Sequence, residues 1–532
     1  MTRRDLICSG AALALTGCVR PNQDHGAFDL LDTGLDEIVA GLHSGRWTSR
    51  GLARWYLERI DRLDSAARVA GPRLNSVLAL HPHVMEQADA LDQELKSKGP
   101  RSPLHGVPIL LKDNIDTADI PTTAGSLALE HWTPPKDAFI AARLRAAGAL
   151  ILGKTNLSEW ANFRSTHSSS GWSGRGGQTR NPHATDHSPS GSSSGSGAAV
   201  AASLCAAAVG TETDGSIVSP ASVCGIVGVK PTVGVVSRSG IVPISHSQDT
   251  AGPMARSVRD AAILFDALVA PDPADAGARS FPVAFRATQS LDAKALQGAR
   301  LGIPRKYFDR NQKMNRFLDA QVDALRKAGA EVIDEAELPS HGKLGDPEFE
   351  VMLYEYKADL NAYLATQPPS APVRSIEQLI AFNDKQKDRE LKWFGQEILH
   401  LALAKGPLTD QKYLDARRQC LQLSRDEGID AVLRKHRLDA IVTLTNGPAW
   451  FIDWVNGDYD TGGCSTVAAV AGYPHITVPA GFVDGLPIGL SFFGTAFAEP
   501  RLFALAYSYE QATRARRKPS LKPGGAAPSS QA

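Results

Sequence analysis

Two short apolar segments with a helical segment between them constrain the fold of this 532-residue chain more than any other feature. Residues 109–111 and 149–153 have the length and the continuous apolar character of buried strands. Residues 139–147 fit a helix. Strand, helix and strand in this order predict an α/β fold whose mixed, mostly parallel central sheet is covered by helices on both faces.

Other segments extend this prediction. Apolar residues at helical spacing dominate residues 31–98, and residues 375–403 also fit helices. Residues 440–444 fit a strand, and residues 476–493 fit a hairpin that turns at Asp484-Gly485, a favoured hairpin dipeptide.

Serine and glycine dominate residues 165–197, where almost no apolar side chain occurs besides Trp172. Tracts of this composition are usually flexible linkers. This tract, however, runs directly into residues 198–204, which fit a buried helix of small residues. We therefore interpret the tract as a glycine-rich loop inside one domain rather than a hinge between two.

The first eighteen residues resemble an export signal. Arg3 and Arg4 precede an apolar stretch, residues 6–15, that is too short to span a bilayer, and the paired arginines are typical of the twin-arginine type. Residues 15–18 (Leu-Thr-Gly-Cys) resemble a bacterial lipobox, which predicts that Cys18 becomes the lipidated first residue. The alternatives are a plain helix or a signal without a lipid. An exported protein, periplasmic or membrane-anchored, is expected.

These features predict an export signal over residues 1–18, a linker over 19–30, one large domain over 31–512 and a flexible tail over 513–532.

The chain contains 57 lysine and arginine residues together and 57 aspartate and glutamate residues together. This balance argues against a nucleic-acid partner, because binding to nucleic acid would require a basic surplus. Cys205 lies in an alanine-rich segment and Cys224 in an apolar one, so buried free thiols are expected there. The oligomeric state stays open.

Three motifs are poor candidates for chemistry. His81 and His83 lack further ligands at a recognisable offset, so no metal site is expected. Ser340 and Lys343 fit Ser-x-x-Lys but lie in a polar loop. Residues 191–195 fit the Gly-x-Ser-x-Gly nucleophile elbow, which needs a buried strand directly before it, and the preceding residues are polar.

Lys112 is a stronger candidate because it ends an apolar segment. Burial would favour its neutral form, and a neutral amine can act as a general base. The turn Asp214-Gly215-Ser216 offers backbone N–H groups beside a hydroxyl, the geometry of an oxyanion hole. Residue types alone favour the alternative that these are ordinary turn residues and that Lys112 reaches water.

The order and extent of the motifs change this balance. Together they resemble the amidase signature family over nearly all of the chain after about residue 30. The matching segments are residues 111–114, 121–126, 153–156, 189–200, 210–217, 224–232, 252–256, 471–474 and 485–489.

The resemblance implies site residues. Ser216 would be the nucleophile, Lys112 the base, and Ser192, held in a cis peptide, the serine that bridges them. Attack by Ser216 on an amide would give an acyl-enzyme, which water then hydrolyses. The oxyanion hole would consist of the N–H groups of Thr213, Asp214, Gly215 and Ser216. No metal or organic cofactor is implied.

Two departures from the family form occur in the nucleophile turn, where Glu212 replaces Asp and Asp214 replaces Gly. The Asp214 carboxylate is expected to point away from the oxyanion site or to pair elsewhere. With residues 170–173 and 176–182, this form is similar to a peptide amidase branch, whose members remove the C-terminal amide of peptides. Candidate substrate contacts, for which core packing is the alternative, are Trp450, Phe451 and Trp454.

The expected partner is therefore a small-molecule or short-peptide amide. A broad aliphatic or aryl amidase is the first alternative, and the transamidase subunit for tRNA charging is opposed by the export signal. A lipid-anchored peptide-binding protein is the alternative from another class. It would have no reason to keep the set Lys112, Ser192 and Ser216.

Overall fold

The computed structural model describes residues 29–64 and 73–524. The chain divides into two units, residues 1–31 and 32–532. Of the first unit only residues 29–31 are described, so the predicted export signal and Cys18 lie outside the described residues. All elements below belong to the second unit.

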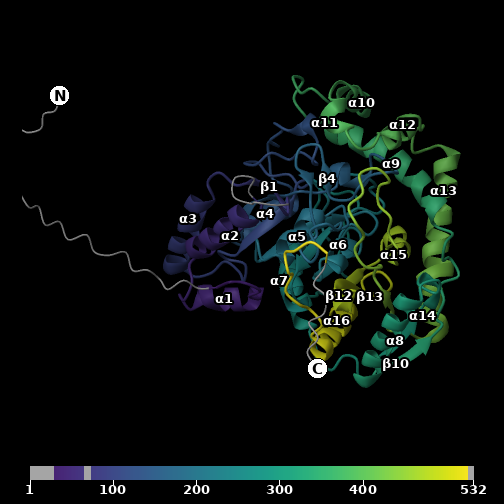
Figure 1. The fold of residues 1–532 in the computed structure, drawn as a ribbon. Helices are drawn as coiled ribbons and strands as arrows, with labels where there is room; N and C mark the ends of the chain where they lie inside the picture. Colours follow the sequence, from purple (N-terminus) through teal and green to yellow (C-terminus); the bar gives the residue numbers. More distant parts are fainter. Residues whose placement is uncertain (1–28, 65–72, 525–532) are drawn as a thin grey trace, which may run out of the picture. The chain divides into compact units, whose positions relative to one another are not determined.

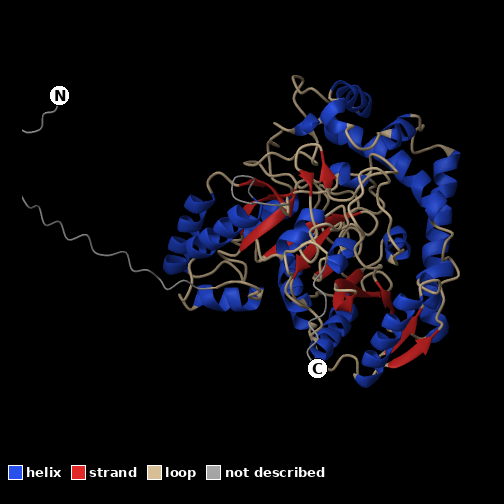
Figure 2. Ribbon diagram, in the orientation of Figure 1, coloured by secondary structure: helices blue, strands red, loops and turns tan. Residues whose placement is uncertain are grey.

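The centre of this unit is an eleven-stranded sheet with the order β1-β3-β2-β6-β8-β7-β12-β13-β11-β9-β10; Figure 2 draws its strands in red. A separate pair, β4 (Trp172–Ser173) and β5 (Gly177–Gln178), lies within the Ser/Gly tract. The strands of the large sheet are β1 (Val77–Leu80), β2 (Pro108–Lys112), β3 (Leu150–Thr155), β6 (Ala207–Glu212), β7 (Val227–Lys230), β8 (Thr250–Ala255), β9 (Arg300–Ile303), β10 (Glu331–Asp334), β11 (Ala440–Leu444), β12 (His475–Val483) and β13 (Leu486–Phe493).

The predicted α/β class with a mixed central sheet is confirmed, but antiparallel pairs outnumber parallel ones. Six of the ten neighbouring pairs are antiparallel, so the expectation of a mostly parallel sheet needs correction. One reason is the hairpin of β12 and β13, which turns at Asp484-Gly485 as predicted. Another is β8, which lies antiparallel to both of its neighbours, β6 and β7.

Helices cover both faces of the sheet (Figure 1). One group contains α5, which packs against β2, β3, β6 and β8, and α6 beside it; another contains α7 and α16. The helices are α1 (Leu35–His43), α2 (Ser49–Asp64), α3 (Val84–Lys98), α4 (Phe139–Ala146), α5 (Ser194–Ala201), α6 (Val218–Val223), α7 (Val258–Leu268), α8 (Gln312–Lys327), α9 (Gly345–Ala365), α10 (Ile376–Lys385), α11 (Lys387–Glu390), α12 (Glu397–Leu403), α13 (Gln411–Leu421), α14 (Asp430–His436), α15 (Ser465–Ala471) and α16 (Glu499–Thr513).

Two helical predictions differ from the structure in detail. The region 31–98 contains α1, α2 and α3, but it also contains the strand β1, which pairs antiparallel with β3. The region 375–403 is divided into α10, α11 and α12. Short amphipathic segments of this kind take their final form from the element against which they pack.

Helix α5 begins within the Ser/Gly tract, earlier than the predicted segment 198–204. Its eight residues are all buried. A Cβ atom at Gly195 would lie 2.3 Å from the backbone oxygen of Ser76, so a larger residue does not fit there. Close packing against the sheet therefore outweighs the low helix propensity of glycine and serine. The tract is a loop inside the domain, as predicted.

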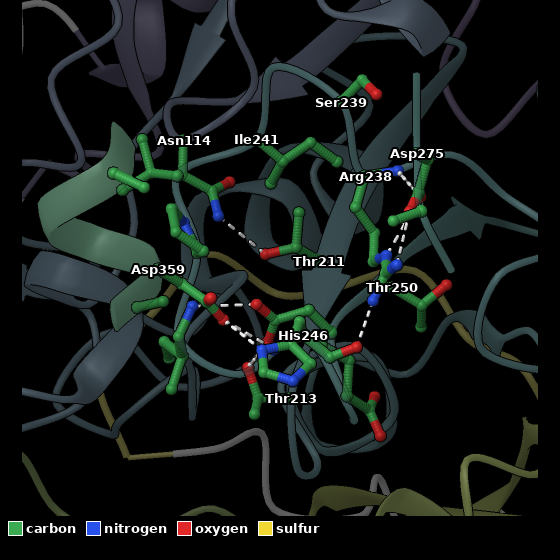
Figure 3. Close-up of a pocket in the computed structure, with 18 of the residues that line it drawn as sticks. Asn114, Thr211, Thr213, Arg238, Ser239, Ile241, His246, Thr250, Asp275 and Asp359 are labelled. Atoms are coloured by element: carbon green, nitrogen blue, oxygen red, sulfur yellow. Dashed lines mark hydrogen bonds and ion pairs between the residues drawn. The ribbon is translucent and has the colours of Figure 1, made fainter. Parts of the chain in front are cut away.

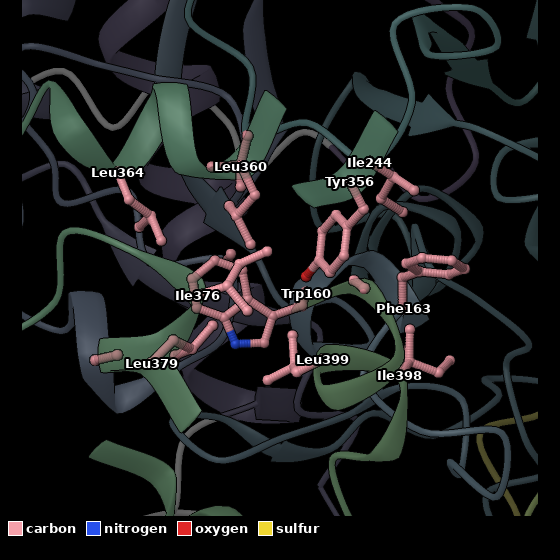
Figure 4. Close-up of a cluster of buried hydrophobic side chains, with 14 of the residues drawn as sticks. Trp160, Phe163, Ile244, Tyr356, Leu360, Leu364, Ile376, Leu379, Ile398 and Leu399 are labelled. Carbon is pink, nitrogen blue, oxygen red and sulfur yellow. The ribbon is translucent and has the colours of Figure 1, made fainter. Parts of the chain in front are cut away.

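A buried hydrophobic cluster joins the helices α9, α10 and α12 to the loop before the Ser/Gly tract. Trp160 and Phe163 of that loop pack against Tyr356, Leu360 and other apolar residues of these helices (Figure 4). This packing anchors the segment that leads into residues 165–197.

The predicted tail, residues 513–532, is described as far as residue 524. Two backbone hydrogen bonds join it to the loop near residue 183: Leu521 donates to the oxygen of Pro182, and Thr185 donates to the oxygen of Lys522. This part of the tail therefore lies against the domain. Across the described ranges, no helix is both long enough and apolar enough for a membrane span.

Candidate active site

Lys112 and Ser192 meet at the carboxyl ends of the central strands β2 and β6. These two strands are parallel neighbours, with Leu111 opposite Val209, so both end on the same side of the sheet. The Nζ of Lys112 lies 2.7 Å from the Oγ of Ser192 and 2.8 Å from the Oγ1 of Thr211. The amine therefore lies between the two hydroxyl groups.

The environment of Lys112 favours its neutral form. The side chain is completely buried, and burial lowers the pKa of its amine to about 7. The carboxylates of Asp249 and Glu212 act in the opposite direction, because their negative charge favours the ammonium form. A large fraction of neutral amine is thus present near neutral pH.

Ser192 and Ser216 are held close by the backbone. The peptide bond between Gly191 and Ser192 is cis, as the resemblance implied. The N–H of Ser193 donates to the backbone oxygen of Ser216 over 3.1 Å, and the Oγ of Ser193 donates to the oxygen of Thr211. The Ser216 side chain is 8% exposed, and its hydroxyl makes no hydrogen bond within residues 29–64 and 73–524.

The turn that contains Ser216 is held from both sides. The Oε2 of Glu212 accepts hydrogen bonds from the N–H groups of Ile217 and Val218, at 2.8 and 3.0 Å. Thr213 donates its hydroxyl to Asp249 over 2.6 Å. Gly215 has φ +76°, a left-handed conformation that favours glycine.

Four consecutive N–H groups of this turn are available for a ligand. None of them donates a hydrogen bond to another described part of the chain, and they belong to Thr213, Asp214, Gly215 and Ser216. An oxyanion hole requires N–H groups that donate to no other protein group. The N–H groups predicted for this role are therefore free to fill it.

The carboxylate of Asp214 pairs elsewhere, as expected. Its Oδ2 accepts a hydrogen bond of 2.7 Å from the hydroxyl of Thr466, while its Oδ1 is buried without a partner in the part of the chain that the structure describes. Burial raises the pKa of this carboxyl group. Asp214 thus leaves the N–H groups of the turn unobstructed.

The turn separates two cavities. The first, about 550 Å³ in volume, is lined by Thr211 and Thr213 and also by Asn114, whose Nδ2 donates to the Oγ1 of Thr211 (Figure 3). The second, about 240 Å³, is lined by Asp214 and Gly215 and by other mainly polar residues. Both cavities adjoin the turn, and the second also contacts Gly191, directly before Ser192.

The three aromatic candidates have different positions. Trp450 lines the second cavity and donates its Nε1 to Asp458 over 2.9 Å. Trp454 donates to Gln178 and stacks on Trp393. Phe451 is 66% exposed. Of the three, Trp450 is thus the one that lines a cavity beside the turn.

Of the motifs judged to be poor candidates, residues 191–195 contain Ser192, which contacts Lys112, whereas the histidine motif has other partners. His81 is hydrogen-bonded to Asp119 through its Nε2 at 2.8 Å.

The side chains of His246, Glu355 and Asp359 form the one described group with enough clustered ligand atoms for a metal ion. In this group His246 is hydrogen-bonded to Asp359, which raises the pKa of the histidine. The thiols of Cys205 and Cys224 are free and buried, as predicted.

Sequence reasoning missed Thr211 and Asp249. Thr211 lies at the end of β6, and a parallel pairing of the segments before residues 112 and 212 would have placed it beside Lys112. Asp249 directly precedes β8, whose first residue, Thr250, lies opposite Glu212 in an antiparallel pair. The chain pattern contains no signal for that pairing.

Comparison with known proteins assigns the family. The amidase family model matches residues 56–503. A probable amidase of Arabidopsis thaliana is 40% identical over 97% of both chains. The structure of peptide amidase from Stenotrophomonas maltophilia is 49% identical with a TM-score of 0.88, over 93% of this chain and 100% of that one. A peptide amidase in complex with the competitive inhibitor chymostatin matches with the same identity and TM-score, over 92% and 100%. The chain therefore belongs to the amidase signature family and is a hydrolase that acts on the C–N bonds of amides.

Proposed function

We propose that this hydrolase cleaves primary carboxamides, and in particular the C-terminal amides of peptides, with Ser216 as nucleophile. The observation that carries the proposal is the hydrogen bond of 2.7 Å between the buried amine of Lys112 and the hydroxyl of Ser192. A buried amine with a lowered pKa, next to a serine that the backbone ties to Ser216, suits a proton relay.

In the acylation step, the Oγ of Ser216 attacks the amide carbon. Its proton passes to Ser192, and the proton of Ser192 passes to the neutral amine of Lys112. The resulting oxyanion accepts hydrogen bonds from the N–H groups of residues 213–216. When the C–N bond breaks, the relay returns one proton to the leaving nitrogen, ammonia departs, and an ester of Ser216 remains.

In the deacylation step, water replaces Ser216 as the attacking group. The water gives a proton to the same relay, and its oxygen attacks the ester carbon. The bond between this carbon and the Oγ of Ser216 then breaks, and the proton returns to Ser216. The products are a carboxylic acid and the free enzyme, so the cycle consumes one amide and one water.

The oxyanion hole is expected to contribute a large share of the rate. Removing one donor from such a site in other enzymes costs about 2.7–4 kcal/mol of transition-state stabilisation. Four N–H groups in one turn, that of Ser216 among them, donate to no described residue, which supports this assignment. Their fixed orientation means that little reorganisation is needed as charge develops.

The preference for peptide amides rests on likeness and on the second cavity. Two structures that match at 49% identity are peptide amidases, one of them with a bound inhibitor. The cavity beside Asp214 is lined mainly by polar residues, which suits a peptide backbone better than an aliphatic chain.

The test is ammonia release over a panel of amidated dipeptides, aliphatic amides and anilides. We expect the highest kcat/KM with the dipeptide amides and a loss of at least about 10³-fold for Ser216→Ala. Ser97→Ala, a change on the exposed face of α3, is the matched control. A higher kcat/KM with aliphatic amides or anilides would favour the broad amidase, and full activity of Ser216→Ala would overturn the assignment of the nucleophile.

A peptide-binding protein without catalysis is the alternative that the same panel tests. It would bind peptide amides but release no ammonia from any of them. For such a protein, Lys112→Ala should leave peptide binding unchanged, whereas the proposed relay requires that the parent protein releases ammonia and that Lys112→Ala severely reduces this release.

We also propose that residues 1–18 direct export and that Cys18 is lipidated. The proposal rests on the paired arginines and the lipobox-like residues 15–18. Labelling of cells with a radioactive fatty acid tests it. The mature protein should carry the label and Cys18→Ser should not, whereas an unlabelled protein with residues 1–18 intact would contradict the proposal.

A further inference from the structure

We propose that the cavity beside Asp214 binds the amino-terminal side of the substrate and selects peptide amides that carry a positive charge. This inference rests on the proposed function, because it assigns the acyl side of the same site. The ligand class is a short peptide amide with a free N-terminal ammonium group or a lysine or arginine side chain.

The first argument is the charge of the cavity. Three carboxylates line it, those of Asp214, Asp458 and Asp460, and its other lining residues include no lysine, arginine or histidine. A concave site with charges of one sign attracts ligands of the opposite sign. An anionic peptide would face these three groups without a compensating cation.

The second argument is an acceptor without a donor. Asn446 lines the cavity and is 5% exposed. Its Nδ2 donates to the Oγ of Ser219 over 2.8 Å, while its Oδ1 has no hydrogen-bond partner among the described residues. Buried polar atoms are normally paired, so this oxygen indicates a ligand that supplies N–H groups. An ammonium or a peptide N–H is such a donor.

The third argument is the position of Asp214. This residue lies two positions before Ser216, and its Oδ1 also lacks a partner within residues 29–64 and 73–524. In an aminoacyl amide, the α-nitrogen lies about 2.5 Å from the carbonyl carbon, because the two atoms are bonded to the same Cα. When Ser216 contacts that carbon, this nitrogen, which is a peptide N–H in a dipeptide amide, is therefore close to the part of the cavity that Asp214 lines. The N-terminal ammonium of a dipeptide amide then lies one residue, at most about 3.6 Å, further from the turn.

Asp458 and Asp460 extend the negative charge away from the turn. Both oxygens of Asp458 accept hydrogen bonds from the N–H of Ser170, so its side chain also holds the loop in place. Asp460 is exposed, and its Oδ1 accepts a hydrogen bond from the N–H of Gly462. Its other oxygen can contact a cation that enters from solvent.

The size of the cavity limits the ligand. Its volume of about 240 Å³ is below the range of about 300–1,000 Å³ that is usual for drug-sized ligands. A short polar segment fits this volume better than a large aromatic or aliphatic acyl group. The charge and the volume thus agree on a short, cationic peptide amide.

The experiment compares kcat/KM for Ala-Ala amide with that for its N-acetyl form, and for Lys-Ala amide with that for Glu-Ala amide, at pH 7. We expect each cationic substrate to exceed its partner about fivefold or more, and the excess to shrink at high salt because charge attraction is screened. Asp460→Asn should reduce both ratios at least about threefold. Asp426→Asn, an exposed carboxylate outside the cavity, should leave both ratios unchanged.

Ratios near one, or ratios that Asp460→Asn does not alter, would overturn the proposal. If N-acetyl and free peptides are hydrolysed equally well, the charge selection fails while the proposed hydrolysis stands. If no amide of the panel is hydrolysed, the proposed function itself fails. Calorimetric binding of the same peptides to Ser216→Ala then tests the cavity without turnover, and tighter binding of the cationic member of each pair is the supporting result.

Discussion

The amine of Lys112 lies 2.7 Å from the hydroxyl oxygen of Ser192, although 80 residues separate them in the chain. Lys112 ends β2, and Ser192 lies two residues before α5, which packs against β2. The hydroxyl of Thr211 lies on another side of the amine, at 2.8 Å. This contact between a buried lysine and a serine is the basis of the proposed relay, and it leads to testable consequences.

The first consequence is a pH profile. If Lys112 is the base, kcat/KM should rise with pH through an apparent pKa near 7, because only the neutral amine accepts a proton. Below pH 7 the rate should fall roughly tenfold for each pH unit, since the amine is then protonated. Initial rates from pH 5 to 9 measure this.

Lys112→Met tests whether Lys112 is the group whose titration causes the rise of kcat/KM near pH 7, the acidic limb of the profile. Its kcat/KM should fall by about 10²–10⁴-fold, the usual contribution of a general base. A circular dichroism spectrum equal to that of the parent protein excludes loss of fold as the cause. A variant that kept both its rate and the limb near pH 7 would show that another group titrates.

The second prediction concerns Asp249. Its negative charge favours the ammonium form of Lys112, so Asp249→Asn should lower the lysine pKa and move the limb of the pH profile to more acidic pH. The maximal rate should also drop about tenfold. One oxygen of the Asp249 carboxylate accepts a hydrogen bond from Thr213, and the other accepts from the N–H groups of Ile244 and Ser245, whereas the asparagine amide has only one acceptor oxygen and loses part of this set. Asp426→Asn is the control, and a shift to alkaline pH would contradict the argument.

A third prediction tests the buried ion pairs beside the Ser/Gly tract. The NH1 of Arg164, whose residue is 1% exposed, lies 2.6 Å from Glu159 and 3.6 Å from the carboxylate of Glu390. Arg164→Met leaves these carboxylates buried without a cation, so the free energy of unfolding should fall by about 3–5 kcal/mol.

Urea denaturation followed by circular dichroism measures this loss. Arg418→Met is the matched control, because Arg418 pairs with Asp415 on the exposed surface, where an ion pair contributes about 0–1 kcal/mol. Equal effects of the two changes would contradict the assigned role of burial.

The fourth prediction concerns the hydrophobic cluster of Figure 4. Leu360 is fully buried there, and Leu360→Ala should lower the free energy of unfolding by about 2–5 kcal/mol through lost burial and a cavity. Leu401, on α12, is 43% exposed, so Leu401→Ala should cost less than about 1 kcal/mol. A loss for Leu360→Ala no larger than that of the control would contradict the packing.

Local pattern predicted many elements but not their pairing. The strands at 109–111 and 440–444 and the hairpin at Asp484-Gly485 are confirmed, because continuous apolar runs and turn residues are properties of neighbouring residues. The strand β1 was missed, since three of its four residues are only partly buried, Leu80 is exposed, and the segment lies between helices. Nothing in the local pattern predicts that β8 lies antiparallel to β6, because the pairing and direction of strands depend on contacts between distant segments.

The sequence by itself determined the family resemblance, the order of the motifs and the set Lys112, Ser192 and Ser216, because these depend on residue types and spacing along the chain. Only the tertiary structure decided how deeply Lys112 is buried and that Thr211 and Asp249 act on the same site. It also decided that Asn446 and Asp460, far along the chain, share a cavity with Asp214. The physical reason is that burial and proximity arise from the pairing of strands and the packing of helices, which bring together residues that no local pattern connects.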